Sequence, residues 1–164
     1  VEREDNYLRF GTLIVDKKLK PIEFRVTSKF CVGELQKIIY GETLKEALFI
    51  EKVGIHLLNS MESEYDYIFC KEKILLNLRN NFPKPVFLLE KFDEWKPKEK
   101  YSFKLISSSG KFEPVLVKYA AVDEKNISQL NKELVEIFKY SDIMEPFKRI
   151  EKAIDYIDKM GLYD

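Results

Sequence analysis

The sequence predicts a mixed α/β domain of the α+β kind. We expect two β-hairpins and a βαβ unit to form a mixed sheet, with C-terminal amphipathic helices on one face. Three observations predict this. Two pairs of β-rich runs each enclose a short polar connector, which is typical of hairpins. A strand, a helix and a strand follow one another between these pairs, and the last third of the chain repeats its apolar residues at helical spacing.

The first hairpin is predicted from residues 8–15 and 22–27. The first run is rich in β-forming residues and more apolar throughout, which favours a place near the sheet centre. The second run alternates apolar and polar residues strictly, which is typical of a strand with one face in water. A polar connector that ends at Pro21 separates the two runs.

Two helices are predicted next. Residues 34–40 space their apolar side chains at three and four, and Gly41 is suited to end that helix. Thr43 and Glu46 match a capping box, in which each side chain bonds a backbone amide of the other residue. The capping box predicts a second helix, which continues to Met61.

Residues 65–70 and 86–89 read as buried strands on either side of a short helix at 74–78. A strand, helix and strand at this spacing predict a parallel pair joined by a right-handed crossover.

A polar segment, residues 91–100, then leads to a second hairpin from 101–106 and 112–120. Pro114 favours an edge or a bulge at the start of the return strand. We expect residues 1–164 to form a single domain, with 91–100 as the place for any internal boundary.

The C-terminal third predicts two amphipathic helices. Leu130, Leu134 and Phe138 share a face of the first helix, and Ile150, Ile154 and others share a face of the second. Such stripes are normally packed against a sheet.

Charge and composition exclude several classes of protein. Twenty-eight basic residues balance twenty-eight acidic ones, so no global field attracts nucleic acid or a membrane surface. No apolar run is long enough to span a membrane, and the charged N-terminal residues lack the apolar core of a signal peptide. A cytoplasmic location is therefore expected. The excess of Lys and Glu over other polar residues is typical of heat-stable proteins.

The sequence also excludes the common catalytic chemistries. His56 is the one histidine, and Cys31 and Cys70 are the two cysteines, so the ligands of a zinc site are missing. We interpret His56 as a partly buried helix residue and both cysteines as reduced, structural thiols. No glycine-rich motif for a nucleotide phosphate is present. No cofactor and no resident metal are therefore expected.

Over residues 7–90, the order hairpin, helix, strand, helix, strand resembles the beginning of the ribonuclease H-like and cytidine deaminase-like folds. The deaminase signature of His-x-Glu and Cys-x-x-Cys is absent, which excludes an active zinc deaminase. The resemblance to ribonuclease H-like nucleases implies a carboxylate cluster holding Mg²⁺. Asp16, Glu23 and Asp66 are the speculative catalytic residues, and Glu34 or Glu42 could add a ligand from a helix.

Two lysine clusters lie close to aromatic residues and are candidate binding residues. Lysine with interleaved rings is typical of proteins that hold single-stranded nucleic acid. The candidates are Lys17, Lys18 and Lys20 in the first hairpin turn, and Trp95, Lys96, Lys98 and Lys100 in the central connector. We expect the indole of Trp95 to fold back on the core, with a partner anchor as the alternative.

By elimination, the leading hypothesis is a non-catalytic protein-interaction or regulatory domain that acts within a larger complex and has a protein partner. The alternatives are a nucleic-acid-binding module and the Mg²⁺-dependent nuclease. Membrane association is not expected, and the oligomeric state stays open.

Overall fold

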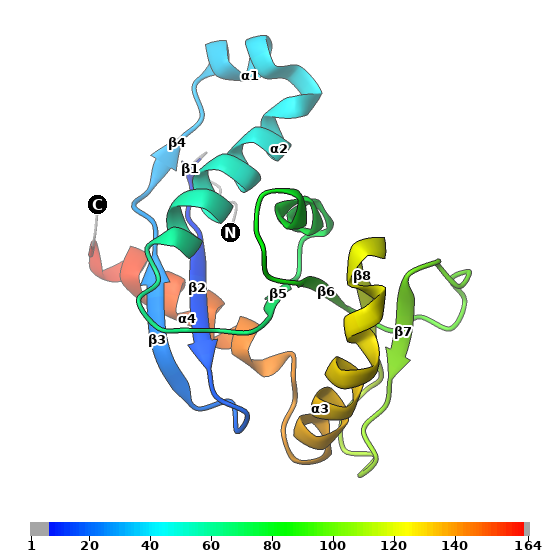
Figure 1. Cartoon of the computed structure of the whole chain (residues 1–164). Helices are drawn as coiled ribbons and strands as arrows, with labels where there is room; N and C mark the ends of the chain where they lie inside the picture. Colours follow the sequence, from blue (N-terminus) through cyan, green and yellow to red (C-terminus); the bar gives the residue numbers. More distant parts are fainter. Residues whose placement is uncertain (1–6, 163–164) are drawn as a thin grey trace. The chain divides into compact units, whose positions relative to one another are not determined.

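The computed structural model describes residues 7–162, without the side chains of residues 52 and 53 (Figure 1). These residues form two compact units. Unit 1 combines residues 7–16, 20–64 and 146–162, and unit 2 combines residues 17–19 and 65–145. Each unit is described by itself.

Unit 1 is built from short strands and a series of helices. Its strands form two separate two-stranded antiparallel sheets, β1 with β4 and β2 with β3. The strands are β1 (Tyr7–Leu8), β2 (Gly11–Val15), β3 (Pro21–Val26) and β4 (Phe30–Cys31). The helices are α1 (Glu34–Tyr40), the 3₁₀ turn η1 (Gly41–Thr43), α2 (Leu44–Ala47), the π-helix η2 (Leu48–Leu57) and α4 (Glu145–Met160).

Helix α4 packs closely on strand β2. A Cβ atom placed on Gly11 would lie 2.8 Å from Cγ2 of Ile150 and 3.3 Å from Cδ1 of Ile154, so only a glycine fits there without movement. Arg9, which is fully buried, forms an ion pair with Asp158 of α4 at 3.1 Å. The apolar stripe of α4 therefore completes the core of unit 1.

Unit 2 contains a mixed four-stranded sheet in the order β5-β6-β8-β7. Its strands are β5 (Ile68–Cys70), β6 (Val86–Lys91), β7 (Ser102–Leu105) and β8 (Val115–Tyr119). Strands β5 and β6 run parallel, and the other neighbours are antiparallel. The helices are the 3₁₀ helices η3 (Lys73–Asn80) and η4 (Ala121–Asn126) and the α-helix α3 (Ile127–Tyr140).

The core of unit 2 lies between this sheet and α3. Val86, Phe87 and Val117 of the sheet have no exposed surface, and neither has Phe138 of α3. The hydroxyl of the buried Ser107 donates a hydrogen bond of 2.9 Å to the carbonyl of Phe138 and so ties the end of α3 to the segment after β7.

A buried ion pair fastens the start of the α3 region to η3. The Nε of Arg79 lies 2.9 Å from an oxygen of Asp123, which is completely buried, and another Arg79 nitrogen donates to the carbonyl of Phe82 at 2.8 Å. Because the two charges satisfy each other, Asp123 can be buried.

The predicted α+β class is confirmed, and so are both hairpins and the parallel βαβ pair. Two details of the arrangement were wrong. The first hairpin forms a sheet of its own instead of joining the mixed sheet, and helix α4 packs against its strand β2. The two C-terminal helices do not share one face, because α3 belongs to unit 2 and α4 to unit 1.

The segment 91–100 joins β6 to β7 inside unit 2, and the units divide at residues 16/17, 19/20, 64/65 and 145/146. That the whole chain behaves as a single domain stays a prediction. None of the helices in the described part combines the length and apolarity needed to span a bilayer.

Candidate functional site

Helix α1 turns its apolar residues toward water. Leu35, Ile38 and Ile39 are 69%, 77% and 69% exposed, and Tyr40 beside them is exposed as well. No residue of α1 is buried, and its most covered residue is Lys37. We call Leu35, Ile38, Ile39 and Tyr40 the α1 face. An ordinary amphipathic helix does the reverse and buries this stripe.

Local contacts set the limits of α1. The side-chain oxygen of Gln36 accepts a hydrogen bond from the backbone amide of Gly33, and Gly41 ends the helix with φ of 51°. The predicted stop at Gly41 is therefore confirmed, whereas the capping box of Thr43 does not form. Its hydroxyl donates to the carbonyl of Tyr40 instead, because the chain is already helical before it.

The second exposed feature is the segment 92–101 of unit 2, which we call the Trp95 loop. The indole of Trp95 is 90% exposed, so the expectation that it folds back on the core was wrong. Its own backbone amide donates to the carboxylate of Asp93 at 3.0 Å, which holds a tight turn. The ring is exposed to solvent on this turn.

Lys118 of β8 fixes the base of this loop. Its ammonium lies 2.7 Å from Glu90 of β6 and 2.7 Å from Glu99 of the loop, and its side chain is nearly buried. The hydrogen bond from Lys118 lowers the pKa of Glu99. One lysine is therefore shared by two carboxylates, one on the sheet and one on the loop.

The predicted lysine candidates fall into two surroundings. Lys96, Lys98 and Lys100 are exposed residues of the Trp95 loop, so they share this loop with the exposed indole. Lys17 and Lys18 are exposed in the turn between β2 and β3, and Lys20 closes that turn through its backbone amide, which donates to Asp16. Their role in binding stays a prediction.

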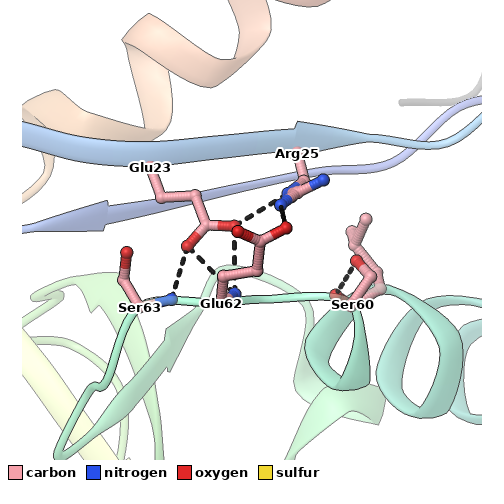
Figure 2. A network of polar contacts seen from close by, with 6 residues as sticks. Glu23, Arg25, Ser60, Glu62 and Ser63 are labelled. Atoms are coloured by element: carbon pink, nitrogen blue, oxygen red, sulfur yellow. Dashed lines mark hydrogen bonds and ion pairs between the residues drawn. The ribbon is translucent and has the colours of Figure 1, made fainter.

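Two of the three candidate carboxylates have structural partners in unit 1. Asp16 accepts the hydrogen bond from Lys20 at 2.9 Å. Glu23 of β3 accepts a bond of 2.7 Å from Nε of Arg25 and another of 2.7 Å from the backbone amide of Ser63, and Figure 2 shows this network. Arg25 also bonds Glu62 at 2.8 Å. Glu23 therefore fastens the segment after η2 to strand β3.

These contacts change the acidity of Glu23. The hydrogen bond from Arg25 and then that from Ser63 lower the pKa of Glu23 to about 2, and the same pairing raises the pKa of Arg25. A carboxylate held in this way is charged at neutral pH and is occupied by its own chain.

The third candidate, Asp66, is exposed in unit 2 at the edge of an open polar depression that Arg79, Lys125 and Glu133 also line. Within residues 7–162, no three His, Cys, Asp or Glu side chains gather closely enough to hold a metal ion. The Mg²⁺-dependent nuclease stays an untested hypothesis, with no carboxylate cluster among the described residues to support it.

The two cysteines and the one histidine belong to no group that could hold a metal ion within residues 7–162. Cys70 is buried, and burial raises the pKa of its thiol to about 12. Cys31 is exposed on β4 and His56 is exposed on η2, so the expected burial of these two side chains was wrong. Both cysteines are free thiols, as expected.

No family model matches this chain, and neither a curated protein nor a solved structure is significantly similar to it. The candidate sites therefore rest on the geometry alone.

The α1 face is the feature that sequence reasoning missed. Leu35, Ile38 and Ile39 were interpreted as an ordinary helix stripe because their spacing is that of a buried one. The short length of the helix between Gly33 and Gly41 is the one signal that could have raised the question, since seven residues offer little surface for packing.

Proposed function

We propose that this chain is a non-catalytic protein-interaction domain that acts within a larger complex and binds its partner through the α1 face. The observation that carries the proposal is the exposure of Leu35, Ile38 and Ile39 on a helix that buries none of its residues. Exposed apolar side chains that adjoin one another mark interaction sites in soluble proteins.

The spacing of these residues suggests how the partner is recognised. Positions i, i+3 and i+4 are the anchors of a helix that lies in an apolar groove of another protein. Lys37 pairs with Glu34 at 2.6 Å on the same helix, which keeps charge at the border of the face. We therefore expect the partner to present an apolar groove with a polar rim.

The size of the face predicts a moderate affinity on its own. A stable interface buries about 800 Å² on each partner and uses roughly 20–30 residues a side. Four residues on one short helix supply the apolar centre of such an interface and not its whole area. A regulated or multi-site assembly fits this better than a permanent pair.

The double variant Leu35→Ser with Ile38→Ser tests the proposal. Since both side chains are exposed, the free energy of unfolding should change by less than about 0.5 kcal/mol for each substitution, while partner binding is lost. The matched control is Ile106→Ser, which alters an isoleucine of similar exposure (56%) in unit 2.

Cys31 allows the partner to be caught at this site. It is exposed two residues before Gly33, whereas Cys70 is buried with a raised pKa and reacts slowly. A thiol-reactive photo-crosslinker on Cys31 in native extract should join a defined protein to the wild type and to Ile106→Ser, but not to the double variant. Equal crosslinking of all three chains would overturn the proposal.

A further inference from the structure

The Trp95 loop exposes an aromatic ring to solvent and is attached to the rest of unit 2 by hydrogen bonds and an ion pair. The amide of Phe92 donates to the carbonyl of Pro114 at 3.1 Å, and the carbonyl of Tyr101 accepts from Tyr119 at 3.1 Å. The ion pair of Glu99 with Lys118 adds a third attachment between these ends. These three contacts attach both ends of the loop and Glu99 to the rest of unit 2, and Trp95 lies between them with 90% of its side chain exposed.

The other two rings of the loop already have cation contacts. The ammonium of Lys104 lies 4.0 Å from the ring centre of Phe92, and that of Lys100 lies 4.9 Å from the ring centre of Tyr101. Within the part of the chain that the structure describes, neither a ring nor a cation stacks on Trp95. The indole is therefore the open aromatic surface of this loop.

The carboxylate of Glu99 reaches the nearly buried Lys118, while the lysines on either side of it, Lys98 and Lys100, are exposed. Lys96 is exposed one residue before Pro97.

The loop carries three carboxylates, those of Asp93, Glu94 and Glu99, along with its three exposed lysines. Glu99 shares Lys118 with Glu90, and Asp93 accepts the amide of Trp95. Among the residues described, no carboxylate lies within ion-pair distance of Lys96 or Lys98, so these two ammonium groups are open to a phosphate.

We propose that the Trp95 loop binds single-stranded nucleic acid without sequence preference, by stacking of a base on Trp95 and contacts of Lys96, Lys98 and Lys100 with phosphates. A single strand offers a planar ring and a negative charge in every nucleotide, which matches an exposed indole and exposed lysines on one loop. An acidic peptide satisfies the lysines and leaves the indole without a stacking partner. The site lies in unit 2 and does not depend on the function proposed for α1.

The chain carries its own reporter for this binding. Trp95 is its one tryptophan, so intrinsic fluorescence arises from the proposed site. Titration with a thymidine oligonucleotide of about 16 nucleotides, the upper site size of a single binding module, should quench the emission. The double variant Leu35→Ser with Ile38→Ser should bind equally well, which separates this proposal from the first.

Two substitutions with a matched control measure the charge contribution. Anisotropy of a labelled oligonucleotide should show that Lys96→Glu with Lys98→Glu weakens binding more than about 10-fold. The slope of log affinity against log salt should fall by about 1.4, since each phosphate contact on a single strand contributes about 0.7. The control Lys132→Glu with Lys139→Glu makes the same charge change at exposed residues of α3 and should leave both quantities unchanged.

The ring is tested by Trp95→Ala against Trp95→Phe. Loss of stacking should weaken binding about 10-fold in the alanine variant, while phenylalanine retains most of the affinity. Circular dichroism confirms that each variant is folded. The proposal is overturned by absent quenching, by equal weakening in the α3 control, or by binding to poly-glutamate or anionic vesicles as tight as that to the oligonucleotide.

Discussion

The two units of this chain secure their cores in different ways. Unit 2 has a four-stranded sheet in which Val86, Phe87 and Leu88 are fully buried in a row, so most of its core comes from neighbouring strands. Unit 1 has two-stranded sheets, and much of each strand is half-buried. A two-stranded hairpin is marginal by itself. Unit 1 therefore depends on helix α4 and on polar attachments such as that of Glu23.

This difference teaches where exposed apolar surface is tolerated. In unit 1 the α1 face is exposed on a helix that buries none of its residues. In unit 2 the large side chains of the sheet are buried, and Trp95 is exposed on a loop outside the sheet. The three changes below probe this comparison in order of decreasing effect.

The buried ion pair of unit 2 should give the largest effect. Asp123→Ala leaves the largely buried Arg79 without its counter-charge and should lower the free energy of unfolding by about 3 kcal/mol. The measurement is chemical denaturation. The control is Glu113→Ala in the exposed pair of Lys91 with Glu113, which should cost less than about 1 kcal/mol. Equal losses would contradict a stabilising role for burial of the pair.

The contact of β2 with α4 should give an intermediate effect in unit 1. Gly11→Ala places a methyl group against Ile150 and should cost about 1–3 kcal/mol of unfolding free energy through overpacking. Adding Ile150→Ala removes the clash, so the double variant should lose less than the sum of the two single variants.

Gly33→Ala serves as the control for that change. A Cβ atom there meets nothing within 4 Å, so no steric cost is expected. Strictly additive losses for Gly11→Ala and Ile150→Ala would show that α4 does not pack on β2 as described.

The attachment of Glu23 should give the smallest effect and one that depends on pH. Its folded pKa of about 2 lies below the ordinary value of 4.5, so its stabilisation is complete above about pH 4.5 and is lost as the pH falls toward 2. The difference in unfolding free energy between wild type and Glu23→Gln should therefore shrink on acidification. A difference that grows toward pH 2 would refute the pairing with Arg25.

The fold could largely be predicted because its elements follow local patterns. Alternation in residues 22–27 and the strand, helix, strand order gave β3 and the parallel pair of β5 with β6. The spacing in α3 and α4 predicts helices equally well for either unit, since an amphipathic stripe does not specify which sheet it covers. That is why the two helices were wrongly assigned to one face.

The site could be predicted less well, because exposure depends on tertiary contacts. The sequence pattern identifies the lysines near Trp95, yet the attachment of their loop through Glu99 and Lys118 joins residues 19 positions apart. The spacing of Leu35, Ile38 and Ile39 is the same for a buried and an exposed helix face, so it does not predict their exposure. The partner of Glu23 is also distant in the sequence, since Ser63 lies 40 residues away.

The order of the chain in unit 1 has a consequence for its synthesis. Gly11 is synthesised 139 residues before its packing partner Ile150. At usual elongation rates the interval is on the order of ten seconds. Residues 65–145 can complete their sheet during this time, whereas the face of β2 that α4 covers stays exposed until α4 is made.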